Sequence, residues 1–385
     1  AHIRIYESMG CEVALAAPTG RAAKRMAEST ACEARTIHRL LEVEFRDEAD
    51  GDEGATFARN EHNLLDADII IIDEASMIDM FLMQALLAAI RPGARLVLLG
   101  DCDQLPSVGA GNVLHDLINS GCFNIVRLTE IFRQGSESLI VTNAHRINRG
   151  EMPVTDARDK DFFFMKREGG ALISTLAEVT AKRLPVTYGV SAFDKIQVIT
   201  PTRKGAAGTE TLNQLLQAEL NPPAKDKAEK KFRNVVFREG DKVMQIRNNY
   251  DLTWDEDGKE RFGIYNGDIG VIGKIYDRQS YMMVSFDGRE VKYGFDLLED
   301  LELAYAITVH KSQESEYPFV VVPVTDFPPM LMTRNLLYTA VTRAKTMAVL
   351  IGREDALSRM VENDREAVRY TGLCDMLQSA GESHV

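Results

Sequence analysis

The stretch Asp66–Met80, "DADIIIIDEASMIDM", places four isoleucines directly before two acids. A run of β-branched residues without alternation is typical of a strand that is buried on both faces, as in a parallel sheet. Ligands of such sheets bind just beyond the carboxyl ends of the strands, which is where Asp73 and Glu74 stand. The stretch therefore predicts an α/β fold with a site beside these two carboxylates.

The two adjacent carboxylates have a chemical and a structural interpretation. One of them can hold Mg²⁺, directly or through water, while its neighbour orients or deprotonates an attacking water, as in the Walker B segment of nucleoside triphosphatases. Alternatively, the acids only lie near the N-terminus of the following helix, where negative charge is favourable. The pair by itself does not decide between the two.

Composition limits the class of protein. The chain has 385 residues and is 45% hydrophobic, which is enough for two or three domains with cores of their own. No run approaches the roughly 20 apolar residues of a membrane span, and no signal-peptide pattern opens the sequence. The five cysteines show no C-x-x-C pairing and no metal-like spacing with histidine. A reducing cytoplasm is therefore expected, without a disulfide framework.

The net charge of −13 argues at first against a nucleic-acid partner. Acids are concentrated in residues 42–61 and 354–385, however, whereas basic groups stand elsewhere in "GRAAKR" (20–25) and "TPTRKG" (200–205). Phosphate binding depends on the local field rather than on the total charge. The sequence thus still permits a phosphate-binding track.

Alternating strand-like and helix-like segments predict a first domain over residues 1–190 with a parallel sheet. The segment "NIVRLTEIFRQ" (124–134) is expected to form a strand and then a loop, and the acidic stretch 43–62 is expected to form a small surface hairpin or a mobile loop. A second alternating unit is predicted over 191–222 and 299–385. Short segments with turn signals between them, 223–298, predict a small antiparallel barrel inserted in that unit.

Seven segments occur in a specific order. They are "LAAPTGRAAKRM", "IIIIDEASMID", "LLGDCDQLPSVGAG", "LTEIFRQ", "VITPTRKG", "YAITVHKSQ" and "LLYTAVTRAK". Over nearly its whole length the chain resembles the superfamily 1 DNA helicases, most closely the RecD-like branch. The resemblance implies an α/β fold of two RecA-like parallel-sheet domains with ATP bound between them, a small β-barrel inserted in the second and a short hairpin in the first.

The resemblance also implies catalytic roles. Asp73 would be the Mg²⁺ partner and Glu74 the acid that activates water, while Gln104 would sense the γ-phosphate and link it to DNA. Arg133 and Arg343 would reach the phosphates with a permanently charged, planar fork. Without its motif, Arg343 would be interpreted as a surface cation on an amphipathic helix.

A track for single-stranded DNA is implied in the same way. Its expected residues are Pro18, Thr19, Gly20, Arg21, Lys24, Thr202, Arg203, His310, Lys311 and Ser312, with Asn248, Asn249 and Tyr250 in the barrel. Arg21 and Lys24 could instead be solvated helix charges. His38 could stack on a base, the usual sequence-independent grip on single strands, or only cap its helix. Movement in the 5′→3′ direction is implied by the resemblance alone.

The sequence contains no G-x-x-x-x-G-K-[ST], because neither Gly258–Lys259 nor Gly273–Lys274 has the upstream glycine or the following hydroxyl residue. In the family this phosphate loop lies just before the helix that precedes "EVALAAPTG", and the chain opens on what looks like the end of that helix. A fragment that lacks the loop, and that binds nucleotide poorly and does not hydrolyse it alone, is therefore expected.

A second departure is "HKSQESEYP" (310–318). Glu314 stands where the family usually has a glycine that lets the backbone approach the γ-phosphate, and an acid there would be repelled unless its side chain points away. A natural variant, an engineered change and a sequence error all remain open. Glu316 matches the family acid that tends to contact the nucleotide sugar.

The resemblance implies an ATP-dependent 5′→3′ DNA helicase with ATP and Mg²⁺ as cofactors. Its expected partners are single-stranded DNA and duplex junctions, with exonuclease-complex subunits or a single-strand-binding protein as further candidates. Three alternatives remain: a non-catalytic DNA-binding or scaffold protein with a dead motor, the helicase subunit of an exonuclease–helicase complex, and the helicase half of a conjugative relaxase. Nuclease activity finds no support, since no further acidic cluster is apparent.

Overall fold

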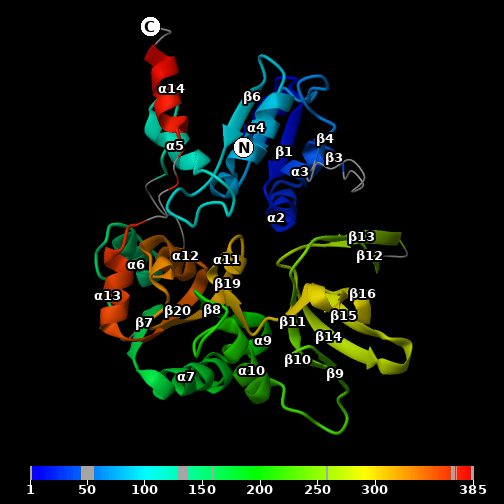
Figure 1. Ribbon diagram of the computed structural model, residues 1–385, viewed down its shortest axis with the longest axis vertical. Helices are drawn as coiled ribbons and strands as arrows, with labels where there is room; N and C mark the ends of the chain where they lie inside the picture. Colours follow the sequence, from blue (N-terminus) through cyan, green and yellow to red (C-terminus); the bar gives the residue numbers. More distant parts are fainter. Residues whose placement is uncertain are drawn as a thin grey trace. The chain divides into compact units, whose positions relative to one another are not determined.

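The computed structural model describes residues 2–44, 56–128, 138–157, 160–256, 259–365, 369 and 371–382. The chain divides into two compact units (Figure 1). Unit 1 comprises Ala1–Thr129 and Ala367–Val385, and unit 2 comprises Glu130–Glu366. Among the described helices, none is long and apolar enough to cross a membrane.

Unit 1 is built on a parallel sheet of four strands. Their order is β2 (Ala34–Thr36), β1 (Val13–Ala17), β5 (Ile69–Ile72) and β6 (Arg95–Leu98). All four isoleucines of β5 are buried. Ile70 and Ile72 pack in one apolar cluster and Ile69 and Ile71 in another, so both faces of the strand are covered. This is the arrangement that the uninterrupted isoleucine run predicts.

Helices cover both faces of this sheet. On the side of Ile70 and Ile72 lie α4 (Met80–Ala89) and α5 (Val113–Ser120), and on the other side lie α1 (His2–Ser8) and α2 (Gly20–Thr30). Shorter elements are α3 (Ile37–Leu40) and the 3₁₀ turn η2 (Ala75–Met77). The short strands β3 (Val43–Glu44) and β4 (Thr56–Phe57) pair antiparallel, which forms the hairpin insertion.

The segment "NIVRLTEIFRQ" (124–134), predicted as a strand and then a loop, forms no strand over its described residues, 124–128. These residues carry no strand pairing, and Val126 and Leu128 are 86% and 92% exposed. The apolar residues of the segment favour a strand. A strand also needs a neighbouring strand to which its backbone N–H and C=O groups can hydrogen-bond, and no described strand of this sheet pairs with the segment.

The end of the chain packs on unit 1, so the prediction that places 299–385 together in the second domain is wrong for residues 369–382. The Arg369 guanidinium donates to the carbonyls of Ser107, Gly109 and Gly111, and to the Ser107 hydroxyl at 3.1 Å. Helix α14 (Leu373–Glu382) then packs along α5. The three loop carbonyls need hydrogen-bond donors, and Arg369 supplies them. These bonds fix this part of the chain on unit 1.

Unit 2 contains the second parallel sheet. Its strands run in the order β18 (Ala306–Thr308), β8 (Ile196–Thr200), β19 (Tyr317–Val324), β20 (Ala344–Gly352) and β7 (Phe162–Lys166). Strand β7 lies beside β20, with Phe162 opposite Ala348. The predicted domain boundary at 190 is therefore wrong, because residues 162–166 supply the edge strand of the second sheet. Local alternation cannot show which sheet a strand joins.

Helices cover both faces of the second sheet (Figure 1). On one face lie α7 (Gly169–Glu178), which continues as the π-helix η3 (Val179–Arg183) and α8 (Leu184–Tyr188), and α10 (Thr209–Leu220). On the other lie α6 (Leu139–Asn148), α12 (Arg334–Thr342) and α13 (Glu354–Glu362). The remaining short helical elements are α9 (Ala192–Lys195), α11 (Val309–Ser312) and η6 (Pro329–Leu331).

An antiparallel unit interrupts this second domain. Five strands form its main sheet, in the order β16 (Arg289–Gly294), β15 (Tyr281–Phe286), β14 (Ile269–Tyr276), β11 (Lys242–Gln245) and β17 (Leu301–Leu303). Two hairpins accompany it: β9 (Glu229–Phe232) with β10 (Val235–Arg238), and β12 (Asn249–Glu256) with β13 (Lys259–Ile264). Two 3₁₀ turns are η4 (Asp277–Gln279) and η5 (Phe295–Asp300). The predicted fold class is confirmed, although the insertion extends through β17, beyond residue 298.

A buried polar joint connects the inserted strands to α10 of the parallel-sheet domain. Asn213, Gln217 and Asn221 recur at intervals of four residues, which places them on one face of the helix, and all three are buried. The Asn213 amide donates to the carbonyls of Leu303 and Ala306 at 2.9 Å each. The polar face of α10 therefore holds the chain where it leaves β17 and enters β18.

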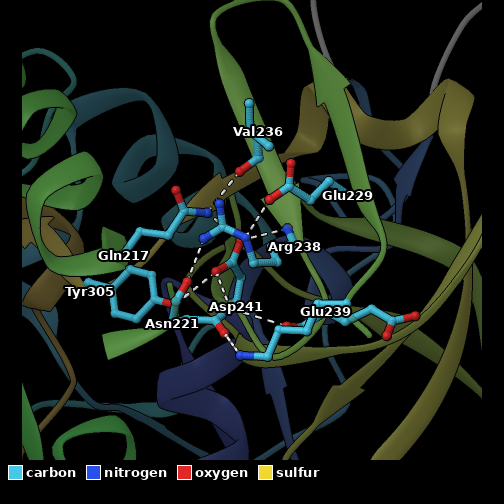
Figure 2. Close-up of polar contacts among 9 residues, drawn as sticks. Gln217, Asn221, Glu229, Val236, Arg238, Glu239, Asp241 and Tyr305 are labelled. Atoms are coloured by element: carbon cyan, nitrogen blue, oxygen red, sulfur yellow. Dashed lines mark hydrogen bonds and ion pairs between the residues drawn. The ribbon is translucent and has the colours of Figure 1, made fainter. Parts of the chain in front are cut away.

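Asp241, which is fully buried, is the centre of this joint (Figure 2). Its carboxylate accepts hydrogen bonds from the Gln217 amide at 2.6 Å, the Asn221 amide at 2.7 Å, the Arg238 backbone N–H at 2.7 Å and the Tyr305 hydroxyl at 2.9 Å. Burial raises the pKa of Asp241 above its ordinary value, and these donors oppose that shift. A fully bonded buried network of this kind specifies one arrangement of the elements that it joins.

Candidate functional site

The acids after β5 are held by backbone geometry. The backbone N–H of Asp73 donates to the Ala16 carbonyl of β1 at 3.0 Å, and the N–H of Glu74 donates to Asp73 Oδ1 at 2.9 Å. Glu74 adopts the left-handed conformation, with φ +52°. That conformation is uncommon for a residue other than glycine and tends to persist at sites where the surroundings determine it.

The end of the neighbouring strand β6 lies close to these acids. A Cβ on Gly100 would approach the backbone nitrogen of Ala75 to 3.0 Å and that of Ser76 to 3.1 Å, so glycine permits this close contact. Beyond Gly100, the Gln104 amide donates to Asp101 Oδ2 at 3.0 Å. The carboxyl ends of β1, β5 and β6 thus bring "PTG", "DEAS" and "GDCDQ" to one edge of a single sheet.

This edge suits magnesium that is carried by a phosphate ligand. Among the described residues, no group of three or more His, Cys, Asp or Glu side chains is arranged to hold a metal by itself. Mg²⁺ is usually bound through one or two carboxylates together with substrate phosphates and waters. Asp73 offers such a carboxylate, and the buried Ser76 hydroxyl close by has no hydrogen-bond partner in the described part of the chain.

The turn after β1 caps a helix. The Thr19 hydroxyl accepts a hydrogen bond from the Ala22 N–H at 3.2 Å, so Pro18, Thr19 and Gly20 lead directly into α2. Lys24 Nζ lies 4.0 Å from Glu28 Oε1, and the two side chains are 40% and 65% exposed. Arg21 and Lys24 are therefore on the first two turns of a helix whose N-terminus follows the sheet edge.

His38 lies on α3, but it does not cap that helix. The Thr36 hydroxyl is the cap, and it accepts from the Arg39 N–H at 3.1 Å. The His38 ring instead packs at a tilt against Phe57 of the hairpin, with 5.9 Å between the ring centroids. Desolvation lowers the pKa of His38, although Asp79 opposes the shift.

In unit 2, two of the predicted DNA-binding segments meet at one edge of the parallel sheet. Thr202 and Arg203 follow β8, and His310 and Lys311 lie on α11 directly after β18, its parallel neighbour. Desolvation lowers the pKa of His310. The Ser312 side chain is fully buried and donates to the Val309 carbonyl at 2.7 Å, so in this structure it supports α11 and does not face solvent.

The predicted residues of the inserted unit lie at the start of β12. Asn248 Oδ1 accepts from the Asn266 N–H at 2.9 Å, and Asn249 Oδ1 accepts from the Asp251 N–H at 3.0 Å. The Tyr250 ring is 36% exposed and meets Tyr265 edge to face, with 6.0 Å between the centroids. The asparagines thus shape the loop, while Tyr250 presents part of an aromatic ring to solvent.

Arg343 and the predicted nucleotide-binding acids gather where β19 begins. Arg343 is 6% exposed, and its guanidinium donates to the Thr339 carbonyl at 3.2 Å and the Ser315 carbonyl at 3.4 Å. Glu316 pairs with Lys345 at 3.0 Å. Glu314 is buried and left-handed, with φ +62°. Arg133 lies outside the described residues.

Several residues were not found from the sequence. Glu302 pairs with both Arg203 and Lys311, and no motif points to it. Arg369 binds the loop after Gln104, from far along the chain. For the polar face of α10, the sequence does contain a usable pattern: Asn213, Gln217 and Asn221 recur with helical spacing, which predicts that they lie on one face of a helix.

Three protein-family models match the chain. An AAA domain matches residues 1–165. The ATP-dependent RecD-like DNA helicase SH3 domain matches residues 212–286, which include most of the inserted strands. The UvrD-like helicase C-terminal domain matches residues 303–351, which include β18 and β19.

Two curated relatives align with nearly all of the chain. The ATP-dependent RecD2 DNA helicase of Deinococcus radiodurans is 34% identical over 375 residues, which are 97% of this chain and 47% of that protein. The RecBCD enzyme subunit RecD of Mycolicibacterium smegmatis is 31% identical over 395 residues, which are 96% of this chain and 66% of that protein. The chain thus spans about half to two thirds of the length of these relatives.

Solved structures share the fold. Bacteroides Pif1 bound to single-stranded DNA superposes with a TM-score of 0.54 at 20% identity, over 99% of this chain and 90% of that one. The Pif1 helicase from Candida albicans gives a TM-score of 0.52 at 17% identity, over 98% and 91% of the two chains. At such identities the likeness is evidence for the fold alone.

Proposed function

Since the chain belongs to the RecD-like branch of the superfamily 1 DNA helicases, we propose that the whole protein is an ATP-dependent motor that moves 5′→3′ along single-stranded DNA and unwinds duplex ahead of it. The observation that carries the proposal is the shared sheet edge in unit 1, where "PTG", "DEAS" and "GDCDQ" follow adjacent parallel strands. Ligands of open α/β sheets bind at such an edge.

The family uses ATP, and we assign the chemistry of its hydrolysis to the acids after β5. Asp73 would hold Mg²⁺, which neutralises phosphate charge when it is bound. Glu74 would orient and deprotonate the attacking water. Its fixed left-handed backbone supports this role, because a catalytic base needs a defined position. Gln104, anchored through Asp101, would report the state of the phosphate to the DNA-binding loops.

The remaining nucleotide contacts are assigned to unit 2. Arg343 would stabilise negative charge on the transferred phosphoryl group, a task to which a planar guanidinium is suited. Glu316 would contact the nucleotide sugar. Glu314 would weaken binding of the γ-phosphate, because a buried carboxylate adds negative charge close to these groups. Arg133 would also reach the phosphates, as the resemblance implies.

Single-stranded DNA would be held mainly by phosphate contacts. Arg203 and Lys311 supply charge at one sheet edge in unit 2, and the backbone N–H groups that follow Pro18 supply donors in unit 1. The Tyr250 ring would stack on a base, which is a sequence-independent contact. His310 would contribute as a neutral ring, because desolvation lowers its pKa.

The test is DNA-stimulated ATP hydrolysis by the whole protein. Glu74→Gln should lower kcat by at least about 100-fold while it leaves affinity for oligothymidylate unchanged, because general-base catalysis is lost and binding is not. Asp66→Asn is the matched control, since the Asp66 side chain is 84% exposed and lies in the same unit. Wild-type kcat in Glu74→Gln would contradict the assignment.

A loading experiment tests direction. Unwinding of a duplex with a 5′ overhang, and none with a 3′ overhang, is the expected result; the opposite preference would contradict the proposal. The 385 residues contain no G-x-x-x-x-G-K-[ST]. We therefore expect hydrolysis only where such a loop is supplied, and DNA binding without it.

A second candidate role is that of a subunit in an exonuclease–helicase complex. It is favoured by the relative named RecBCD enzyme subunit RecD, which aligns with 96% of this chain. Purification of the tagged whole protein from its own host distinguishes the two roles. Stoichiometric recovery of two further large subunits would support the complex, and recovery of the motor alone would support the independent enzyme.

A further inference from the structure

Glu302 lies between two cations that the proposed function assigns to DNA. Its carboxylate accepts from Arg203, in the loop after β8, and from Lys311 Nζ on α11 at 3.1 Å. The three residues come from three separate segments: β17 of the inserted unit supplies the acid, and the parallel-sheet domain supplies both cations. One carboxylate therefore neutralises part of a two-cation site.

The position of Glu302 is fixed by the strand that carries it. Its neighbours Leu301 and Leu303 are 4% and 8% exposed, and β17 pairs with β11, where Glu302 stands opposite Met244. The Asn213 amide holds the Leu303 carbonyl at 2.9 Å. Three residues after Glu302, Tyr305 is tied to Asp241 in the buried joint (Figure 2). The acid is thus presented by rigid structure rather than by a mobile loop.

The ion pairs themselves remain open to exchange. The side chains of Arg203, Glu302 and Lys311 are 61%, 31% and 26% exposed. Ion pairs between side chains in contact with water are weak, so a phosphate can replace the carboxylate as partner of either cation. A fixed acid beside an exposed cation pair competes with phosphate without blocking it.

We propose that Glu302 is an acidic competitor for DNA phosphate, which lowers the affinity of the Arg203–Lys311 pair for single-stranded DNA and so favours release of the strand. The inference rests on the proposed function in one respect, namely that Arg203 and Lys311 contact phosphate. A motor that steps along DNA must break its phosphate contacts repeatedly, and a built-in competitor lowers the barrier to doing so.

The test is the binding of labelled oligothymidylate to this chain, measured by fluorescence anisotropy over a series of salt concentrations. Glu302→Gln keeps the shape and an acceptor oxygen but removes the charge. It should tighten binding about three- to tenfold at low salt and increase the salt dependence of binding, because both cations then become available to phosphate. Glu302→Asp, which keeps the charge, should bind within about twofold of wild type.

Asp277→Asn is the matched control. Asp277 also pairs with a lysine of the inserted unit, Lys230, at 2.8 Å, and its side chain is 71% exposed. The control removes the same net charge away from the two cations and should leave affinity unchanged. Equal tightening by Asp277→Asn and Glu302→Gln would reduce the effect to net charge and overturn the proposal.

The cation variants separate failure of the inference from failure of the proposed function. Lys311→Ala and Arg203→Ala should each weaken binding. If they do, and Glu302→Gln binds no more tightly than wild type, the competitor role is wrong and the DNA-binding assignment stands. If neither alanine variant changes the affinity, these cations do not contact DNA, and both the inference and that part of the proposed function are overturned.

Discussion

The hydroxyl of Tyr305 donates a 2.9 Å hydrogen bond to the carboxylate of Asp241, and both side chains are buried. Tyr305 lies between β17 and β18, where the chain leaves the inserted unit, and Asp241 precedes β11, where the inserted sheet begins. The bond therefore joins the exit of the inserted unit to the start of its five-stranded sheet. The inserted unit is therefore held in position by a buried polar network as well as by apolar packing.

Loss of this bond should destabilise unit 2. Tyr305→Phe removes one donor to a buried acid and should lower the free energy of unfolding by about 1.5–3 kcal/mol, the range for hydrogen bonds to charged groups. Asp241→Ala removes the acceptor of both the Tyr305 hydroxyl and the Arg238 backbone N–H. It should cost more, about 3–5 kcal/mol, because each unsatisfied buried donor costs about 1–3 kcal/mol. Urea denaturation of this chain measures both. Tyr276→Phe, at a ring that is 39% exposed, is the control, and an equal loss there would argue against the network.

The sequence predicted the parts of the fold that local pattern determines. The isoleucines of β5 specify a strand buried on both faces, and the structure buries all of them. Residues 162–166 fall within the first predicted domain, 1–190, but form the edge strand β7 of the second sheet, because a local pattern does not show beside which strand a segment lies. Strand β7 pairs with β20, which lies almost two hundred residues further along the chain, so a short stretch of sequence cannot identify this neighbour.

The candidate site shows the same division. Asp73, Glu74 and Gln104 could be predicted as site residues because each follows a strand in a recognisable segment. Glu302 could not, since its two ion pairs join segments that are distant in sequence and its neighbours are ordinary strand residues. Ser312 has a motif position but a buried side chain, so the motif located the segment without showing which atoms face solvent.

Two substitutions of Glu314 can separate the effect of its negative charge from the effect of its strained backbone. It is buried with φ +62°, a conformation that glycine adopts freely and that costs other residues roughly 1–2 kcal/mol. Glu314→Gly and Glu314→Ala both remove the acid, but only the alanine variant keeps a Cβ at positive φ. The glycine variant should therefore be about 1 kcal/mol more stable than the alanine variant by urea denaturation.

The same pair of variants tests the effect on nucleotide binding in the whole protein. If repulsion by the acid weakens ATP binding, both variants should lower the KM for ATP. If the backbone at residue 314 must also approach the γ-phosphate closely, the glycine variant should lower the KM for ATP further than the alanine variant does. An unchanged KM in both variants would show that the Glu314 carboxylate points away from the nucleotide.

His310 and Lys311 are neighbours with different expected charge. Desolvation lowers the pKa of His310 from the ordinary 6.5, so the ring is neutral at pH 7.5 and becomes charged only at a pH below that ordinary value. At pH 7.5, Lys311→Ala should reduce the salt slope of single-stranded DNA binding by up to about 0.7, the value for one complete phosphate contact, and His310→Gln should not change it.

Acidification provides the control for this assignment. As the pH falls through the lowered pKa, His310 gains a proton, and the salt slope of the wild-type chain should rise while that of His310→Gln does not. Anisotropy titrations at several salt concentrations and pH values measure both slopes. A reduced slope for His310→Gln at pH 7.5 would show that the ring is already charged there, against the expected direction of the shift.

Arg343 tests whether a buried arginine serves catalysis or only structure. Its guanidinium donates to the Thr339 and Ser315 carbonyls and, at 3.2 Å, to the Thr342 hydroxyl, which a lysine ammonium cannot reproduce in the same fork geometry. Arg343→Lys should lower kcat for ATP hydrolysis by the whole protein about 10³-fold, as expected for an arginine that stabilises a transferring phosphoryl group.

Arg353→Lys is the control, since Arg353 pairs with Asp326 and Asp355 on the surface. If Arg343→Lys instead unfolds at lower urea concentration but keeps kcat within about threefold of wild type, the residue has a structural role, because only a catalytic role requires kcat to fall in protein that is still folded.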